Sequence, residues 1–297
     1  MHTRVKLLEE PLSLQPAYTN WPTAYTPFIP PRLGITHPLF TQPETKDIVA
    51  MPRKTLRILC FGDSLTSGYF CHGMDSHPYA LKLEDRLTGT FPEVDFQIVV
   101  NAVPGDVASF KRFKDRMDAA WEDNYYDWTI ILGGTNDIAY GVTSENIFSA
   151  LKDLYDVPLS RESKVLALTV PECQSKGKRG TSTRNELNQS ILMNKDTGYY
   201  AFDLHSKIPY HSLSERDRER YWDDGLHLRD EGYDWMGNHI ADALIDILWS
   251  EGTFEEPTNS RTSEVLALED EVQFDEEDGN PRNIKEGYVV VRKKDLD

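Results

Sequence analysis

The chain has 297 residues, of which 39% are hydrophobic, so it is long enough for one large domain or two small ones with a proper core. Its formal net charge is −17, and residues 251–297 contribute −8 of this with 14 acidic and 6 basic residues. A surface this acidic repels phosphate backbones and anionic lipid headgroups, and the sequence contains no clustered stripe of Lys and Arg. We therefore expect no nucleic-acid partner.

The cysteines and the hydropathy of the chain suggest a location in the cell. Cys60, Cys71 and Cys173 form no CxxC pair and no spacing typical of a disulfide framework or a zinc site. Neither the N-terminus nor any other stretch has an apolar run long enough for a signal peptide or for the roughly 20 residues of a membrane span. These observations predict reduced thiols and a cytoplasmic protein without a membrane span. The sequence contains no signal for an oligomeric state.

Composition divides the chain into three parts. Nine of the 17 prolines lie in the first 52 residues and alternate with aromatic residues, which predicts an extended N-terminal arm over residues 1–54. Residues 55–250 alternate short apolar runs with longer amphipathic stretches and are predicted to form the catalytic domain. Residues 251–297 are rich in Asp and Glu and are predicted to form an acidic, partly disordered tail.

Five apolar runs in the middle part have the pattern of strands that are buried on both faces, as in a parallel sheet. They are residues 56–61, 96–100, 128–132, 165–170 and 199–204. Amphipathic stretches between and after them predict helices over residues 79–87, 107–121, 144–155, 183–194 and 229–249. The alternation predicts an α/β fold, a three-layer α/β/α sandwich with a five-stranded parallel sheet. In such a fold the ligand site lies beyond the carboxyl ends of the strands.

Four short motifs place reactive or polar residues just after predicted strands or before the last helix. FGDSL presents Ser64 directly after the first strand, and NAVPG contains Gly105, which lets a backbone N–H approach a substrate oxygen without a side chain in the way. GGTND follows the third strand and offers the side-chain amide of Asn136. DDGLHL places Asp224 three residues before His227, close enough for the two side chains to meet. Each motif alone is weak, because ordinary turns use the same residues, but the four together point to one site.

The four motifs, in this order, resemble those of the GDSL or SGNH hydrolase family, and the resemblance covers about residues 56–250. It implies a flavodoxin-like SGNH hydrolase fold. It also implies a family role for four residues of this chain, which are Ser64, Gly105, Asn136 and His227. Asp224 is implied as the third member of a catalytic triad, and Asp223 is less favoured because it lies one residue off the pattern.

The chemistry of these residues leads to the same function. A serine hydroxyl is a weak nucleophile at neutral pH, and an imidazole with an ordinary pKa of about 6.5 can accept its proton. His227 is placed to act as this base, with Asp224 orienting its ring. An oxyanion hole is expected from the backbone N–H groups of Ser64 and Gly105 and from the side chain of Asn136. We therefore predict a serine esterase that forms an acyl-enzyme on Ser64 with a small acyl ester.

Alternatives to this hydrolase stay open on the sequence alone. An acyltransferase would use the same acyl-enzyme and pass the acyl group to another alcohol or amine. A non-catalytic module would keep the fold and bind a protein through the arm or the tail, although a complete set of catalytic groups argues against it. No metal or organic cofactor is expected, because His205 and His211 have no partner at metal-ligand spacing and the phosphate-binding glycine motifs are absent from the sequence.

Charged residues beside the motifs have simpler interpretations. Asp63 and Asp137 are predicted to bond the backbone of turns. Lys176, Lys178 and Arg179 fall in a predicted loop over residues 170–181 that would help to shape the pocket. A solvated basic loop is the simpler explanation for them, and a contact with an anionic substrate group is the alternative.

Overall fold

The computed structural model describes residues 54–254. The predicted N-terminal arm, apart from its last residue, and the acidic tail beyond residue 254 lie outside the described residues. Both therefore stay predictions. The described part corresponds closely to the catalytic domain predicted over residues 55–250.

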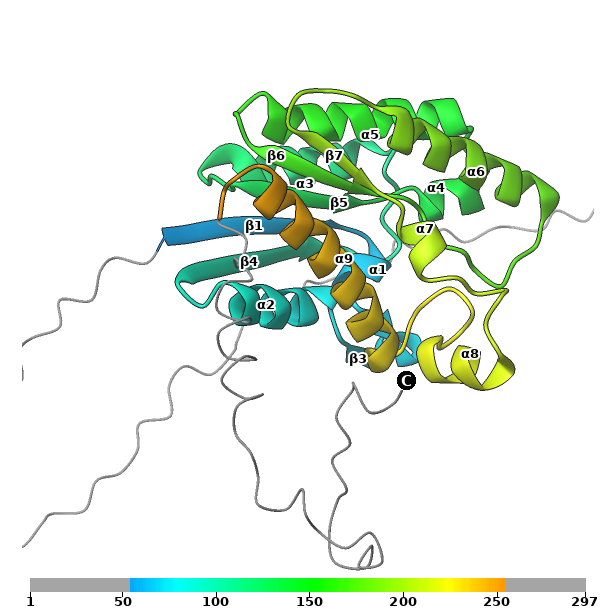
Figure 1. Cartoon of the computed structure of the whole chain (residues 1–297). Helices are drawn as coiled ribbons and strands as arrows, with labels where there is room; N and C mark the ends of the chain where they lie inside the picture. The colour runs from blue at the N-terminus through cyan, green and yellow to red at the C-terminus, as the bar shows by residue number, and fades with distance from the viewer. Residues whose placement is uncertain (1–53, 255–297) are drawn as a thin grey trace, which may run out of the picture. The chain divides into compact units, whose positions relative to one another are not determined.

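The centre of the described part is a sheet of five strands that all run parallel, as predicted (Figure 1). Its strands are β1 (Lys54–Gly62), β4 (Val94–Ala102), β5 (Trp128–Leu132), β6 (Lys164–Leu168) and β7 (Tyr199–Phe202). A separate antiparallel ribbon consists of β2 (Tyr69–Phe70) and β3 (Asp75–Ser76). The order in the sheet is β4-β1-β5-β6-β7, so the chain adds β4 on one side of β1 and every later strand on the other.

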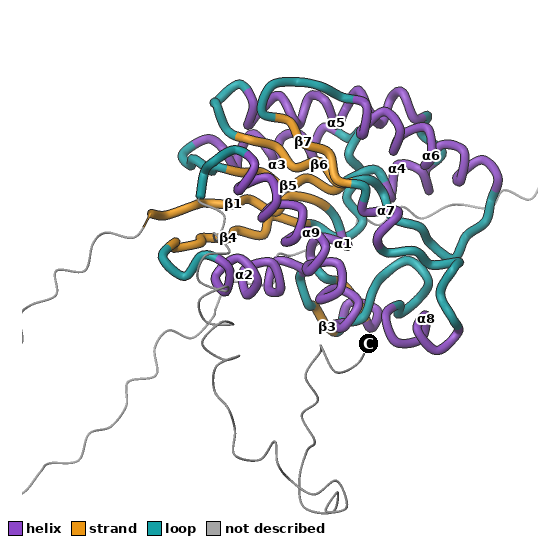
Figure 2. Tube along the Cα trace, viewed as in Figure 1, coloured by secondary structure: helices purple, strands orange, loops and turns teal. Residues whose placement is uncertain are grey.

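Helices cover both faces of the sheet, which confirms the three-layer α/β/α sandwich (Figures 1 and 2). One face packs against α2 and α9, and the opposite face packs against α3, α5 and α6. The helical segments are α1 (Ser64–Ser67), η1 (Cys71–Gly73), α2 (Tyr79–Thr90), α3 (Lys111–Glu122), α4 (Thr135–Tyr140), α5 (Ser144–Leu159), α6 (Lys178–Met193), α7 (Leu204–Lys207), α8 (Glu215–Tyr221) and α9 (Asp230–Ser250).

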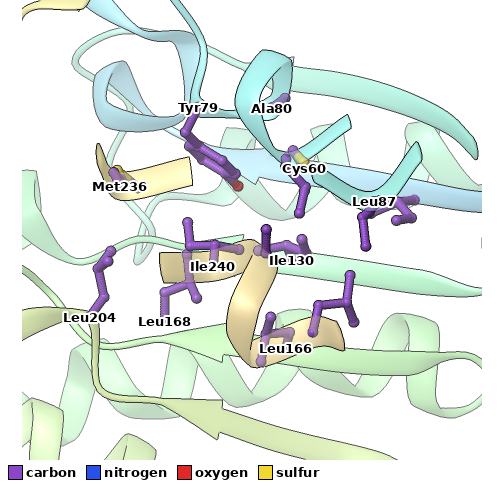
Figure 3. Close-up of a cluster of buried hydrophobic side chains, with 14 of the residues drawn as sticks. Cys60, Tyr79, Ala80, Leu87, Ile130, Leu166, Leu168, Leu204, Met236 and Ile240 are labelled. Atoms are coloured by element: carbon purple, nitrogen blue, oxygen red, sulfur yellow. The ribbon is translucent and has the colours of Figure 1, made fainter. Parts of the chain in front are cut away.

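The alternation of side chains along β1 shows why this strand is apolar throughout. Ile58 and Cys60 point into the core under α2 and α9, whereas Leu59 and Phe61 point into the core under α3 and α5. Figure 3 shows Cys60 in the core under α2 and α9, beside Tyr79 of α2. Burial raises the pKa of the Cys60 thiol to about 12, so it acts as a small core residue, as predicted.

Two helices begin several residues away from their predicted starts. The helix predicted from residue 107 begins only at Lys111, because the Asp137 carboxylate accepts hydrogen bonds from the backbone N–H groups of Ala108 and Ser109 and holds them outside the helix. The helix predicted from residue 183 begins at Lys178, inside the predicted loop. Two glycines in that stretch lower the helix propensity and hide its start in the sequence.

The sheet topology creates a switch point at the carboxyl end of β1. There β1 lies between β4, whose crossover goes one way, and β5, whose crossover goes the other. The register places Gly62 at the end of β1 opposite Ala102 of β4 and Leu132 of β5, so the three strands end at the same level. The segments that follow these strands carry Ser64, Gly105 and Asn136, and the fold therefore gathers them at one edge.

Candidate active site

Ser64 is the first residue of the short helix α1, directly behind the end of β1. The Asp63 carboxylate caps this helix by accepting from the backbone N–H of Leu65 at 3.0 Å. Gly62 is required just before it, because a Cβ at that position would lie 2.6 Å from the Leu132 carbonyl oxygen of β5. Ser64 is only 6% exposed, so the tight turn presents its hydroxyl in a nearly dry environment.

The loop between α8 and α9 brings Asp224 and His227 to this serine. The Nε2 of His227 lies 2.9 Å from the Oγ of Ser64, across 163 residues of sequence. The Nδ1 of the same ring lies 2.8 Å from Oδ2 of Asp224. The other Asp224 oxygen accepts from the backbone N–H groups of Leu226 and His227, and Gly225 between them adopts a φ of +81°, which favours glycine. The backbone of the loop thus fixes the carboxylate that faces the imidazole.

Charge and packing hold the His227 ring in this orientation. Partial burial opposes ionisation of Asp224, but hydrogen bonds from the His227 ring and from two backbone N–H groups hold the pKa of this carboxyl below its usual value. Asp224 is therefore an anion at neutral pH. The ring of Tyr69 packs against the His227 ring with 4.7 Å between the ring centroids.

Asp223, the less favoured triad candidate, has a different contact. Its carboxylate accepts from the backbone N–H of Cys71 at 2.8 Å and lies 3.6 Å from the Arg229 guanidinium. It therefore links the loop of Asp224 and His227 to the segment that carries Tyr69.

Gly105 and Asn136 lie on the segments that follow β4 and β5. Gly105 has a φ of +75°, and apart from its two chain neighbours no residue of the described part lies within 4 Å of where its Cβ would be, so the backbone is open on that side. The Nδ2 of Asn136 donates to the Asp106 carbonyl oxygen at 2.8 Å and makes a longer contact of 3.3 Å with Oδ2 of Asp63. Within residues 54–254 the backbone N–H groups of Ser64 and Gly105 have no protein acceptor.

A buried network of charges that the motifs did not reveal supports these segments. Asp106, 2% exposed, binds the side chain of Arg112 at 2.5 Å and that of Arg116 at 3.1 Å. Arg116 also donates to the carbonyl oxygens of Gly62 and Asn101, at the ends of β1 and β4. One guanidinium thus ties both strand ends to the segment of Gly105. The sequence signal was only a lone Asp followed by a helix with many charged residues, which is typical of many solvated surfaces.

Asp63 has a larger role than the predicted bond to turn backbone. It is fully buried, and burial raises the pKa of its carboxyl to about 7, helped by the negative charges of Asp137 and Asp106 and opposed by Arg116. It touches both the turn of Ser64 and the amide of Asn136. Asp137 bonds turn backbone as predicted, and the turn it holds is that of Ala108 and Ser109.

Metal ligation and membrane insertion can be assessed for the described residues. His205 and His211 lie near the Glu172 carboxylate, which accepts from the backbone N–H groups of Tyr210 and His211. Between residues 54 and 254 no three His, Cys, Asp or Glu side chains are grouped as metal ligands. In the same range no helix combines the length and the apolar character needed to cross a membrane.

Several solved structures share the fold of this chain. A protein named as an arylesterase, from Agrobacterium tumefaciens str. C58, is 23% identical to this chain and has a TM-score of 0.52. The match covers 65% of this chain and 100% of that protein. A carbohydrate acetylesterase family member from Sinorhizobium meliloti is 16% identical, with a TM-score of 0.52 over 65% of this chain and 99% of its own. A carbohydrate esterase family 3 protein from Talaromyces cellulolyticus is 13% identical, with a TM-score of 0.50 over 66% and 99%. At these identities the likeness establishes the fold.

Sequence comparison assigns the family. A search of curated proteins found no match. The model of the GDSL-like Lipase/Acylhydrolase family matches residues 60–235, which is more than half of the chain and includes all four motifs. The chain therefore belongs to the GDSL-like lipase/acylhydrolase family and is a hydrolase, as its motifs predicted.

Proposed function

We propose that the protein is a carboxylic ester hydrolase that works through an acyl-enzyme on Ser64. The observation that carries the proposal is the continuous line of hydrogen-bonding atoms from Asp224 through His227 to the Ser64 hydroxyl, with distances of 2.8 and 2.9 Å. Both distances are within the range expected for a nucleophile, a base and an orienting carboxylate.

The acylation step follows from this arrangement. The Ser64 oxygen attacks the ester carbonyl carbon while its proton passes to Nε2 of His227. The imidazolium that forms is stabilised by the Asp224 anion. When the tetrahedral intermediate collapses, the same proton goes to the leaving alcohol and the acyl group stays on Ser64. Water then repeats the sequence on the acyl-enzyme, so that an acid and the free serine are released.

We assign the oxyanion hole to the backbone N–H groups of Ser64 and Gly105 and to the side chain of Asn136. The two N–H groups are available, because no acceptor within residues 54–254 takes them. The Asn136 amide has two hydrogens, and the shorter bond to the Asp106 carbonyl takes one and orients the group. The second hydrogen makes only the longer contact of 3.3 Å with Asp63, so it is the one available to a substrate oxygen.

The proposal is tested first without choosing a substrate. Purified protein is treated with a fluorophosphonate probe, and the adduct is located by intact mass and peptide mass spectrometry. We expect one adduct on Ser64 and none in Ser64→Ala. A matched control is Ser67→Ala, which removes a hydroxyl three residues further on that bonds the Ser64 carbonyl oxygen, and which should still be labelled. A folded wild-type protein that takes up no probe would refute the proposal.

Hydrolysis is then measured with acetyl and butyryl esters of 4-nitrophenol, in the presence and absence of a competing alcohol. We expect free acid as the main product. If the acyl group passes mainly to dilute alcohol, the protein is an acyltransferase and the hydrolytic half of the proposal is wrong.

A further inference from the structure

Within the part of the chain that the structure describes, Arg184 on α6 is a buried cation without a carboxylate partner. The residue is only 8% exposed, and no Asp or Glu of the described part lies within salt-bridge distance of it. Its Nη2 donates to Sγ of Cys173 at 2.9 Å, and its buried Nε has no partner within residues 54–254. Thiol sulfur is a weak acceptor, and a buried charge is costly unless an anion or strong acceptors compensate it. The surroundings of Arg184 therefore favour the binding of an anion.

The helix geometry places Arg184 beside the active site. Leu187 and Asn188 lie three and four residues further along α6, on the same face of the helix as Arg184. Leu187 lies 2.9 Å from where a Cβ of Gly134 would be, two residues before Asn136. Asn188 binds both the N–H and the carbonyl of Val170, just behind β6. Arg184 precedes these two residues by one turn on the same face of α6, so it lies near the segments that follow β5 and β6, at the carboxyl edge of the sheet.

The segment that covers Arg184 connects the two halves of the catalytic machinery. Gln174 donates its backbone N–H to the Gly225 carbonyl of the catalytic loop at 2.7 Å. At the other end of the segment, Arg179 donates to the carbonyl of Gly141, which follows the helix of Asn136. The exposed side chains of Lys176 and Lys178 lie between these two ties.

We propose that Arg184, with Lys176 and Lys178 at the rim, forms an anion-binding subsite of the esterase site. The preferred substrate is then an ester that carries a negative charge, such as a carboxylate, on its acyl or alcohol part. A guanidinium can bind such a group with two parallel hydrogen bonds, and lysines at the rim attract it in an otherwise acidic protein. The inference rests on the proposed function, because it concerns the substrate of the Ser64 site.

The test compares esters that differ only in charge. The first pair is 4-acetoxybenzoate and its neutral methyl ester, with the charge on the alcohol part. The second pair is the 4-nitrophenyl monoester of adipic acid and its methyl ester, with the charge on the acyl part. The readout is the ratio of kcat/KM for the anionic and the neutral member, so that intrinsic differences in reactivity cancel between variants. Wild type is compared with Arg184→Gln and with the double variant Lys176→Ala/Lys178→Ala.

In at least one pair, we expect the ratio to fall about tenfold in Arg184→Gln, as loss of a hydrogen bond to a charged group predicts. The double lysine variant should lower it severalfold, and more at low salt than at high salt. The double variant decides the matter if Arg184→Gln does not fold, because both lysines are exposed. The matched control is Lys195→Ala. Lys195 is exposed and lies just beyond the C-terminal end of α6. Its distance along the helix axis from the proposed subsite is roughly 20 Å, which exceeds the screening length. This variant should leave the ratio unchanged.

The outcomes separate the two proposals. Ratios that are unchanged in both test variants, for both pairs, would overturn the anion subsite and leave the esterase standing. Failure of wild type to hydrolyse any of the four esters, together with no labelling of Ser64, would overturn the esterase and the subsite with it.

Discussion

Replacing Asp63 by Asn should make the protein less sensitive to alkaline pH. The Asp63 carboxyl is fully buried, and its pKa is raised from the ordinary 3.8 to about 7 in the folded protein. A carboxyl with a raised pKa binds its proton more tightly in the folded than in the unfolded chain. The stability that comes from this proton is complete below pH 3.8 and is lost as the pH rises through 7.

The size of the effect follows from the two pKa values. Over the whole range the difference corresponds to at most about 4 kcal/mol of unfolding free energy, and between pH 5 and pH 8.5 to about 3 kcal/mol. Asn has the shape of the protonated acid and cannot ionise, and its carbonyl oxygen can still accept from Leu65. Wild type and Asp63→Asn should therefore have similar stability near pH 5, and the variant should be the more stable near pH 8.5.

Urea unfolding followed by tryptophan fluorescence measures both proteins at the two pH values. The matched control is Asp123→Asn, which removes an exposed carboxylate at the end of α3 and accounts for the change in net charge. The difference between Asp63→Asn and wild type should grow by about 3 kcal/mol from pH 5 to pH 8.5. A difference that stays constant within about 0.5 kcal/mol would refute the reasoning, because Asp63 would then ionise equally in both states.

Three further substitutions test the site and its support. Asp224→Asn should lower kcat by about 10⁴ while the fold is kept, because the amide cannot hold the imidazole in the reactive tautomer; stopped assays and circular dichroism check both parts. Asn136→Ala should lower kcat by about 10² to 10³ through loss of one oxyanion donor, and an equal rise of KM at unchanged kcat would contradict this role. Arg116→Met should destabilise the protein by about 3 to 5 kcal/mol in urea unfolding, because Asp106 stays buried without the more buried of its two arginine partners. A loss below about 1 kcal/mol would show that Arg112 suffices.

The sequence determined the architecture because the relevant signals are local. The apolar runs of the strands and the amphipathic stretches of the helices are periodic within a few residues, and they predicted the five-stranded parallel sheet and its layers. Asp224 and His227 are also local, since three residues of one loop separate them, and their contact could be expected from the spacing alone. Boundaries were harder, because a long-range contact from Asp137 delays the start of α3.

The site as a whole depends on contacts between distant parts of the chain. Only the tertiary structure brings Ser64 to His227 across 163 residues, gives Asp63 its contact with Asn136 and ties Arg116 to two strand ends. It also shows that Arg184 is buried without a carboxylate partner in the described part of the chain, which no motif of the sequence indicated. Burial and nearby charges determine the pKa of an ionisable group. Both are properties of the packed fold and leave no pattern in the sequence.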